Sequence, residues 1–380
     1  MRREAVGRME AKKRMANFEL LRLLAMVMVV VMHFLSHSDS LIMLDQPLSK
    51  VRVLGSLLEA FSLAAVNTYL LLSGYLGTRS SFKPGKAVSL LCQIWFYALL
   101  VPVILGLSGV SVTASKLGIY GVIQYIFPIE TEHYWFATSY LMLYLLTPVL
   151  NRAAVNLTKR QFGIVLGGLL ILFSGIKSIS PVVFAFDRYG YDLAWFICVY
   201  LVGAYLGLYG GERLKKSGWL LYVGSALLGF GVNIVMWFFS QKWDAFSYYF
   251  TVPFHYNFFP CLAGAVGLLY GFSGISIKEG AFARAVRRMG GLSFGIYLLH
   301  EHIDLRERWY GWLKQIVNPA GKEGVPIFLG ELIFCTVLLF AAGILIDWIR
   351  NFGFRAAGSV LGKTKLSRKL KELDACFKEN

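Results

Sequence analysis

The sequence predicts an all-α membrane protein, a polytopic bundle of about ten transmembrane helices with both termini in the cytoplasm. Hydrophobic residues make up 57% of its 380 residues and charged residues only 16%, a balance that ordinary soluble domains do not have. Apolar stretches long enough to cross the roughly 30 Å hydrocarbon core of a bilayer recur along the whole chain. Lysine and arginine gather in alternate connections between these stretches, which orients the bundle.

Ten apolar stretches reach the length of a membrane span, and an even number of crossings places both chain ends on the same side. They lie near residues 17–36, 54–77, 87–108, 133–151, 160–176, 191–209, 218–240, 251–273, 289–304 and 326–349. These bounds predict a basic N-terminal segment (1–16), a transmembrane domain (17–349) and a basic amphipathic tail (350–380). We expect the N-terminal segment to be retained, because the first span is long and no small-residue cleavage site follows it.

The positive charges decide which side is cytoplasmic. Of the 38 lysines and arginines, 27 lie in the two termini and the even-numbered connections, and 10 lie in the odd-numbered connections. By the positive-inside rule both termini are cytoplasmic. The net charge of +16 is therefore accounted for by topology, and no basic patch interleaved with aromatic residues points to nucleic acid.

Several segments depart from a plain helical span. The ninth stretch is short and rich in glycine, and residues 278–289 before it are expected to form a basic amphipathic helix on the inner surface. The outer connection 109–132 is expected to contain a partly inserted segment, and the connection 305–325 is rich in charge and tryptophan. The basic tail is expected to lie against anionic lipid.

The first span carries two polar residues on one face. Arg22 and His33 are eleven positions apart, which is about 20° past three helical turns and about 16 Å along the axis. A charged residue inside a span costs about 2.5 to 3.5 kcal/mol, so it is first interpreted as functional. The alternative is that Arg22 extends to the nearer interface and His33 only makes a polar contact between helices.

All histidines are predicted to lie towards the outer face, and they are His33, His37, His133, His255, His300 and His302. An imidazole there is suited to act as general base or acyl acceptor, since its pKa near 6.5 lets it exchange protons at neutral pH. Carboxylates at the same level could orient the rings, namely Glu59, Glu132, Asp192 and Glu301. No metal is expected, because His33 and His37 have no third ligand at a recognisable spacing. The five cysteines likewise suggest neither a disulfide framework nor a metal site.

The inner ends of spans one to five carry basic residues that could hold a polyanionic donor from the cytoplasm. They are Arg22, Arg79, Lys83, Lys86, Arg152, Lys159 and Arg160. Positive-inside topology alone would place most of them there. Arg22 is the exception, because it lies too deep to be a residue of a connection.

Four segments together resemble a known family. Arg22, ten residues and His33 in a first span resemble the signature of acyltransferase family 3, the integral-membrane acylases of cell-surface glycans. Further similar segments are VNTYLLLSGYLG (66–77), HYWFATSYLMLYLLTPVLN (133–151) and LSFGIYLLHEH (292–302). The resemblance covers essentially the whole chain.

The resemblance implies an O-acyltransferase of a bacterial cell membrane. It would move an acyl group, usually acetyl, from cytoplasmic acyl-CoA to a hydroxyl of a surface polysaccharide or a lipid-linked glycan outside. Acyl-CoA would be a co-substrate, with no permanently bound cofactor, and the other partners would be the glycan acceptor and membrane lipids. Some relatives carry an extra extracytoplasmic domain, but this chain has only about thirty residues after its last span, so it is expected to act alone.

The resemblance also assigns roles to residues. His33 would be the base or a transient acyl carrier, with His300 and Glu301 assisting. The donor would be held by Arg22, Ser73, Gly74, Tyr75 and Arg79. The acceptor side would be lined by His133, Trp135 and Tyr297. The acyl group is expected to cross on the thioester arm, which would reach up a funnel, rather than on a side chain.

Two other functions stay open on the sequence. One is an exporter of a glycan or small molecule whose intramembrane Arg22 and His33 gate passage. It would ideally show inverted repeats with broken helices in both halves, and the sequence has no such repeat. The other is a structural subunit of an envelope complex.

Overall fold

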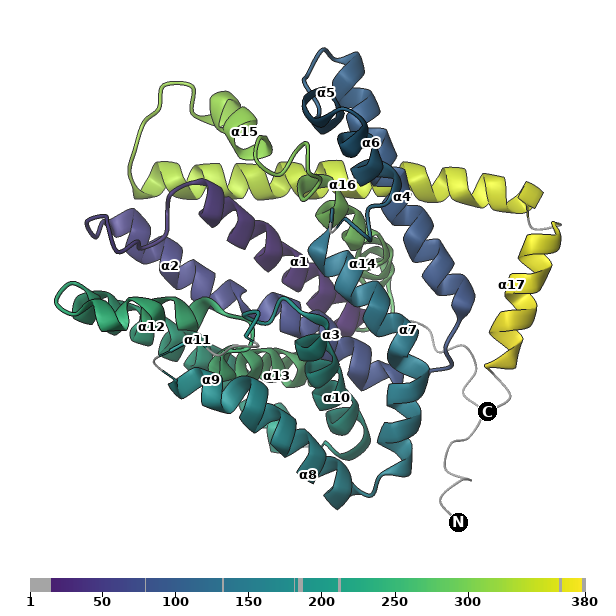
Figure 1. The fold of residues 1–380 in the computed structure, drawn as a ribbon, viewed down its shortest axis with the longest axis horizontal. Coiled ribbons are helices and arrows are strands. Elements are labelled where there is room, and N and C mark those ends of the chain that lie inside the picture. The colour runs from purple at the N-terminus through teal and green to yellow at the C-terminus, as the bar shows by residue number, and fades with distance from the viewer. Residues whose placement is uncertain are drawn as a thin grey trace.

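The computed structural model describes residues 15–78, 80–131, 133–180, 182–183, 187–210, 213–361 and 364–377, and the regular structure in these ranges is helical (Figure 1). Each of the ten predicted spans coincides with a helix or with consecutive helices. The long elements are α1 (Ala16–His37), α2 (Lys50–Ser62), α3 (Ala64–Gly77), α4 (Pro84–Leu107), α7 (Trp135–Asn156), α8 (Lys159–Leu170), α10 (Leu193–Tyr209), α11 (Arg213–Ser240), α13 (Phe259–Ser273), α14 (Ala281–His300) and α16 (Val325–Leu361).

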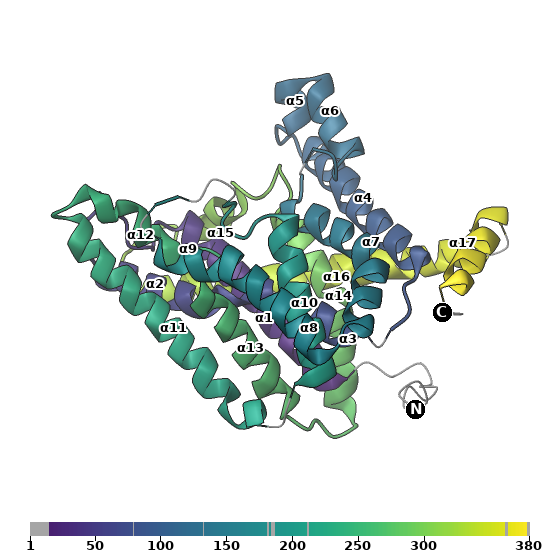
Figure 2. The same cartoon turned by 60° about the horizontal axis from the view of Figure 1, so that its bottom comes forward.

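Short elements complete or connect these helices. They are α5 (Thr113–Leu117), α6 (Ile119–Ile126), η1 (Ile171–Gly175), α9 (Ile176–Ile179), η2 (Asp244–Phe246), α12 (Ser247–Thr251), η3 (Val252–Phe254), α15 (Trp309–Val317) and α17 (Lys365–Cys376). Helices α5 and α6 occupy the connection predicted to be partly inserted, and they project from the bundle (Figure 2).

Among the described residues, seven helical segments are long and apolar enough to cross a membrane. They are Ala16–His37, Lys50–Gly77, Pro84–Leu107, Lys159–Ile179, Leu214–Ser240, Asp244–Ser273 and Val325–Gly358. Helix α10 is apolar but shorter, and α7 and α14 do not meet this criterion. In the part of the chain that it describes, the structure thus confirms an all-helical fold with seven helical segments that could span a membrane, while the number ten stays a prediction.

Long-range contacts show which chain segments lie at the same end of the bundle. At one end, the side chain of Asn17 donates to the Phe272 carbonyl at 3.0 Å, and the Phe18 and Tyr75 rings meet at 5.6 Å. Gly85 donates from its backbone to Asp374 of α17 at 2.9 Å. The start of α1 and the C-terminal helix therefore lie at this same end, called the inner end below. Which side of the membrane it faces stays a prediction.

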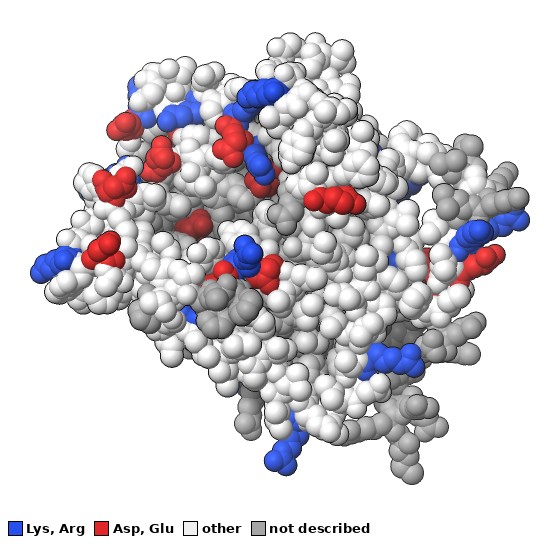
Figure 3. Space-filling view, in the orientation of Figure 1, with Lys and Arg blue, Asp and Glu red and all other residues white. Residues whose placement is uncertain are grey.

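The opposite, outer end is held by contacts among the connections. The Arg308 side chain donates to the Ser111 carbonyl at 2.6 Å, and Trp237 donates to the Met43 carbonyl at 3.0 Å. Charged side chains gather around this end in the upper left of Figure 3, where the surface over the outer end of α1 is hollowed.

Glycines allow α3 and α10 to pack with their backbones in contact. A Cβ at Gly74 would lie 1.9 Å from the carbonyl oxygen of Tyr200, and one at Gly203 would lie 2.3 Å from that of Leu71. Close approach through small residues is the usual way in which membrane helices associate. Gly74, expected at the donor site, therefore has a packing role against α10.

Two predicted boundaries differ from the structure. Helix α14 runs unbroken from Ala281 to His300, so residues 278–289 do not form a separate surface helix. The reason is packing, since Gly295 of α14 lies tightly against Tyr97 and Asp347, and such contacts outweigh the low helix propensity of glycine. Helix α16 continues to Leu361, twelve residues beyond the predicted end of its span.

Candidate functional site

Helices α1 and α14 bring two histidines together near the outer end. His33 lies one turn before the end of α1, and His300 is the last residue of α14. His33 Nδ1 and His300 Nε2 are 2.8 Å apart, a hydrogen-bond distance. His300 is fully buried, whereas the side chain of His33 is 23% exposed. The pair thus has one member that a substrate can reach.

The surroundings fix which nitrogen carries each proton. His300 Nδ1 lies 2.6 Å from the carbonyl oxygen of Ile296, and a carbonyl can only accept, so this nitrogen carries hydrogen. In the neutral ring His300 Nε2 is then an acceptor, and it takes the hydrogen of His33 Nδ1. The remaining nitrogen, His33 Nε2, is left with a free lone pair. This arrangement suits a general base.

A carboxylate completes the group. Glu301 follows His300 directly, is buried, and places Oε1 3.3 Å from His33 Nδ1. Its negative charge would stabilise His33 when that ring takes a second proton. The geometry therefore provides a base, a hydrogen-bond partner that orients it and a countercharge.

The same three side chains could also hold a metal ion. One ligand atom each from His33, His300 and Glu301 lie within 4.8 Å of one another. The resemblance had already assigned all three residues to one catalytic group, but no local spacing indicated them as metal ligands, because 267 positions separate the two histidines along the chain. The fold, not a local spacing, creates it.

His133 and His302 form a second histidine pair. Their ring centroids are 4.5 Å apart. His133 Nδ1 faces the Gln124 carbonyl at 3.2 Å, and Nε2 accepts from the backbone of Ile303 at 3.4 Å. Both nitrogens of the buried His133 thus have protein partners. His133, expected on the acceptor side, is accounted for as a residue that joins the outer connections.

At the inner end, Arg22 is paired within its own helix. Its guanidinium donates to Glu19, whose side chain is 1% exposed, while that of Arg22 is 27% exposed. Glu19 packs so closely on α14 that a Cβ at Gly290 would lie 2.5 Å from its Oε2. Arg22 is therefore a partly accessible cation held by a buried partner.

A chain of hydroxyl groups leads from α3 to the Arg22 backbone. The Tyr69 hydroxyl donates to the Arg22 carbonyl at 2.7 Å. Ser73 donates to the Tyr69 carbonyl at 2.9 Å and lies 3.1 Å from the Tyr140 hydroxyl. Tyr75 packs on Phe18. Ser73 is thus linked to the Arg22 backbone through Tyr69, and Tyr75 contacts Phe18, one turn before Arg22. Arg79 and Glu132 lie outside the described residues.

A column of aromatic rings connects the two polar groups. Ring centroids are 6.2 Å apart for Tyr69 and Phe136, 5.8 Å for Phe136 and Tyr297, and 6.3 Å for Tyr297 and His300. Tyr69 and Phe136 were not singled out from the sequence. Tyr69 lies in the segment with the Ser-Gly-Tyr motif and Phe136 in the segment with the Trp-Phe motif, and these positions could have indicated both residues.

Trp135 belongs to a neighbouring aromatic cluster. Its ring lies 4.5 Å from that of Tyr191 and 6.0 Å from that of Tyr256, nearly parallel to the latter. Tyr191 is exposed. An exposed aromatic face of this kind is compatible with the acceptor side expected for Trp135.

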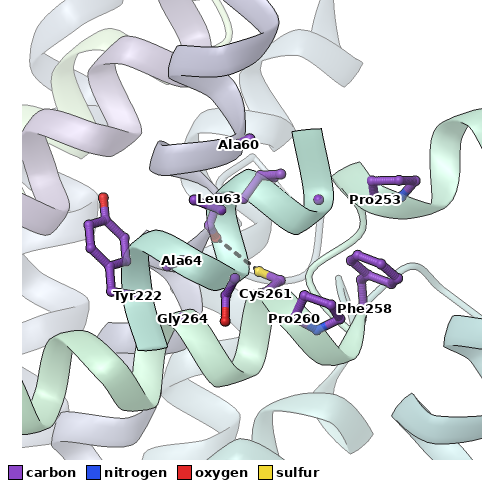
Figure 4. Close-up of a pocket in the computed structure, with 12 residues that line it drawn as sticks. Ala60, Leu63, Ala64, Tyr222, Pro253, Phe258, Pro260, Cys261 and Gly264 are labelled. Atoms are coloured by element: carbon purple, nitrogen blue, oxygen red, sulfur yellow. Dashed lines mark hydrogen bonds between the residues drawn. The ribbon is translucent and has the colours of Figure 1, made fainter. Parts of the chain in front are cut away.

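A separate pocket between α2, α3, α11 and α13 is unrelated to this chemistry (Figure 4). Its lining includes Leu63, Tyr222 and Cys261, and the Cys261 thiol donates to the Leu63 carbonyl at 3.4 Å. The cavity measures about 10 Å³, room for about one water molecule. It is a packing gap.

A comparison with models of protein families assigns the chain to one family. A family model described as an acyltransferase domain matches residues 15–348, which includes both polar groups and the aromatic column. Comparisons with curated proteins and with solved structures find no match.

Proposed function

The chain belongs to acyltransferase family 3, and from this premise we propose that it is an O-acyltransferase of a bacterial cell membrane. It takes an acyl group, in the simplest case acetyl, from acyl-CoA at the inner end. The acceptor is a hydroxyl of a surface polysaccharide or lipid-linked glycan at the outer end. The observation that carries the proposal is the direction of the hydrogen bond between the two histidines. Because His33 donates from Nδ1 to His300 Nε2, His33 Nε2 is left free to accept a proton.

In this reaction His33 Nε2 removes the proton of the acceptor hydroxyl as its oxygen attacks the thioester carbonyl. General-base catalysis of this kind contributes about 10² to 10⁴ in rate. Glu301, 3.3 Å from His33 Nδ1, stabilises the imidazolium. The imidazolium then returns its proton to the departing CoA thiolate, so the enzyme ends in its starting state.

Arg22 is the proposed contact for the CoA donor. Its side chain is partly exposed and is held in place by the buried Glu19, so its guanidinium is already oriented for a phosphate or the thioester end. The aromatic column from Tyr69 to Tyr297 marks the route to His33. Arg22 and His33 are about 16 Å apart along α1, comparable to the reach of a pantetheine arm.

The test is acyl transfer by the purified protein in liposomes. Labelled acetyl-CoA is supplied with a glycan acceptor, and labelled product is measured for the wild type, His33→Gln and His37→Gln. His37 is the control, because it lies one turn further along α1 and its nearest partners are Trp309 and Glu307.

We expect His33→Gln to lose at least about a hundredfold in turnover, with His37→Gln close to wild type. Wild-type turnover by a correctly inserted His33→Gln protein would refute the base assignment. A wild-type protein that transfers no acyl group but carries labelled glycan across the liposome would favour an exporter.

A further inference from the structure

The N-terminal end of α7 packs against α14 close to His300, since the Tyr134 hydroxyl donates to the Leu298 carbonyl at 2.9 Å. The helix begins at Trp135, and its N-cap residue Tyr134 provides no side-chain cap. The backbone N–H of Thr138 bonds to the Tyr134 carbonyl at 3.0 Å, so the N–H groups of residues 135–137 precede the first bond of the helix. Such N–H groups, with the positive end of the helix dipole, favour a negative charge in front of them.

A buried hydroxyl on the facing helix α14 meets this helix end. Tyr297 is 4% exposed, and its Oη has no hydrogen-bond partner of good geometry. The Tyr297 ring packs on that of Phe136, the second residue of α7, with centroids 5.8 Å apart, so the hydroxyl belongs to the surroundings of this helix end. Leaving a buried polar group without a partner costs about 1 to 3 kcal/mol. Packing of the ring alone gives no reason for a hydroxyl at this position, since phenylalanine would pack equally well.

The hydroxyl also belongs to the proposed reaction site. Tyr297 and His300 are three positions apart on α14 and share a face of the helix, with ring centroids 6.3 Å apart. His300 in turn contacts His33. Tyr297 therefore lies where the aromatic column from the donor side reaches the base.

We infer that the Tyr297 hydroxyl and the N–H groups at the start of α7 form an oxyanion site for acyl transfer. This inference rests on the proposed function. The acceptor oxygen bonds to the thioester carbon while its proton passes to His33 Nε2, and the carbonyl electron pair moves onto the carbonyl oxygen. Tyr297 and the α7 N–H groups donate to that oxygen. When the carbonyl re-forms, the C–S bond breaks, and the CoA thiolate takes the proton from His33.

The direct test is Tyr297→Phe, which removes one oxygen atom. Loss of one oxyanion donor lowers kcat by about 10² to 10³, so we expect a fall of that size, with the KM for acyl-CoA within about twofold of wild type. The matched control is Tyr134→Phe. Tyr134 is an equally buried neighbour, but its hydroxyl already donates to the Leu298 carbonyl at 2.9 Å, and its kcat should stay within a few-fold of wild type.

The outcomes separate this inference from the proposed function. If wild type transfers acyl groups, His33→Gln does not, and Tyr297→Phe keeps wild-type kcat, the oxyanion site is refuted while the function stands. A wild type without transfer would refute both. Should Tyr297→Phe not fold, 4-fluorophenylalanine at position 297 replaces it. Its fluorine fills the place of the hydroxyl but donates no hydrogen bond, so kcat should fall as expected for Tyr297→Phe, and a wild-type kcat would refute the site.

Discussion

His300 is fixed between two partners, with Nε2 2.8 Å from His33 Nδ1 and Nδ1 2.6 Å from the Ile296 carbonyl. Because a carbonyl accepts only, this second contact sets the tautomer of His300 and, through it, that of His33. The nitrogen proposed to act as the base is thus determined by a backbone group on α14. In metal-bound and catalytic histidines generally, the hydrogen bond made by one ring nitrogen likewise sets the protonation of the other.

His300 should therefore act through orientation. We expect His300→Ala to reduce kcat by about 10- to 100-fold, less than His33→Gln, because His33 loses its fixed tautomer but keeps its basic nitrogen. His300→Gln, which retains an acceptor for His33 Nδ1, should recover part of the loss. Equal loss in His300→Ala and His33→Gln, with no recovery in His300→Gln, would show that His300 itself takes part in proton transfer.

Arg22 offers a test of the donor site. Arg22→Lys keeps the positive charge and the pairing with Glu19 but loses the planar fork that binds phosphate or carboxylate in two places. We expect at least about a tenfold loss in kcat/KM for acyl-CoA, with normal insertion. Arg287→Lys on α14, whose guanidinium binds Glu279 in two places at 2.9 and 2.7 Å, serves as the matched control. Full activity in Arg22→Lys would indicate a structural role for the charge.

Much of the fold follows from the sequence because it depends on local periodicity. The apolar stretches place the helices, and the helical period puts Arg22 and His33 on one face. The pairing of His133 with His302 could not be predicted in this way, since the intervening connection decides it. The unbroken α14 was also missed, because Gly295 is stabilised in the helix by contacts with Tyr97 and Asp347, which no local rule contains. The unpartnered hydroxyl of Tyr297 is likewise a property of the packed bundle.

Substitution of Gly74 can distinguish a role in helix packing from a role in donor binding. Its added Cβ would meet the Tyr200 backbone at 1.9 Å, and a backbone cannot move aside without separating α3 from α10. We expect Gly74→Ala to lower the unfolding temperature and the yield of folded protein. Gly106→Ala on α4, which has open space around its Cβ, should be neutral or slightly stabilising. A well-folded Gly74→Ala protein with only a raised KM for acyl-CoA would favour a direct donor contact.

The geometry of the cluster of His33, His300 and Glu301 leads to a prediction about metal ions. Zinc bonds to histidine of about 2.0 to 2.1 Å hold two nitrogens about 3.3 Å apart in a tetrahedral site, whereas the two facing nitrogens here are 2.8 Å apart. Treatment with EDTA should therefore leave acyl transfer unchanged. Added Zn²⁺ should inhibit by displacing the shared proton, and Glu301→Gln should weaken this inhibition while His37→Gln does not. Activity that is lost with EDTA and restored by a metal would make the ion a required cofactor.

The buried pair of Lys177 and Asp187 near the outer end should stabilise the fold. Their side chains are 3% and 2% exposed, and Asp187 also accepts from Asn257 and from the Tyr189 backbone, each at 2.8 Å. Burial raises the pKa of Asp187, but the hydrogen bonds from Lys177, Asn257 and Tyr189 outweigh it and hold the pKa below its ordinary value.

A carboxyl group with a lowered pKa stabilises the folded state above its unfolded pKa of about 3.9, and that stability is lost as the pH falls through the lower folded value. The contribution of Asp187 to the unfolding temperature should thus be constant from about pH 5 to 8 and decline only below about pH 4. Asp187→Asn leaves the charge of Lys177 buried without its partner, at a cost of about 3 to 5 kcal/mol, so its unfolding temperature at neutral pH should fall clearly. Asp244→Asn, at an exposed residue bonded to Ser247, is the control. An Asp187→Asn protein that unfolds at the wild-type temperature would show that Lys177 does not need this carboxylate.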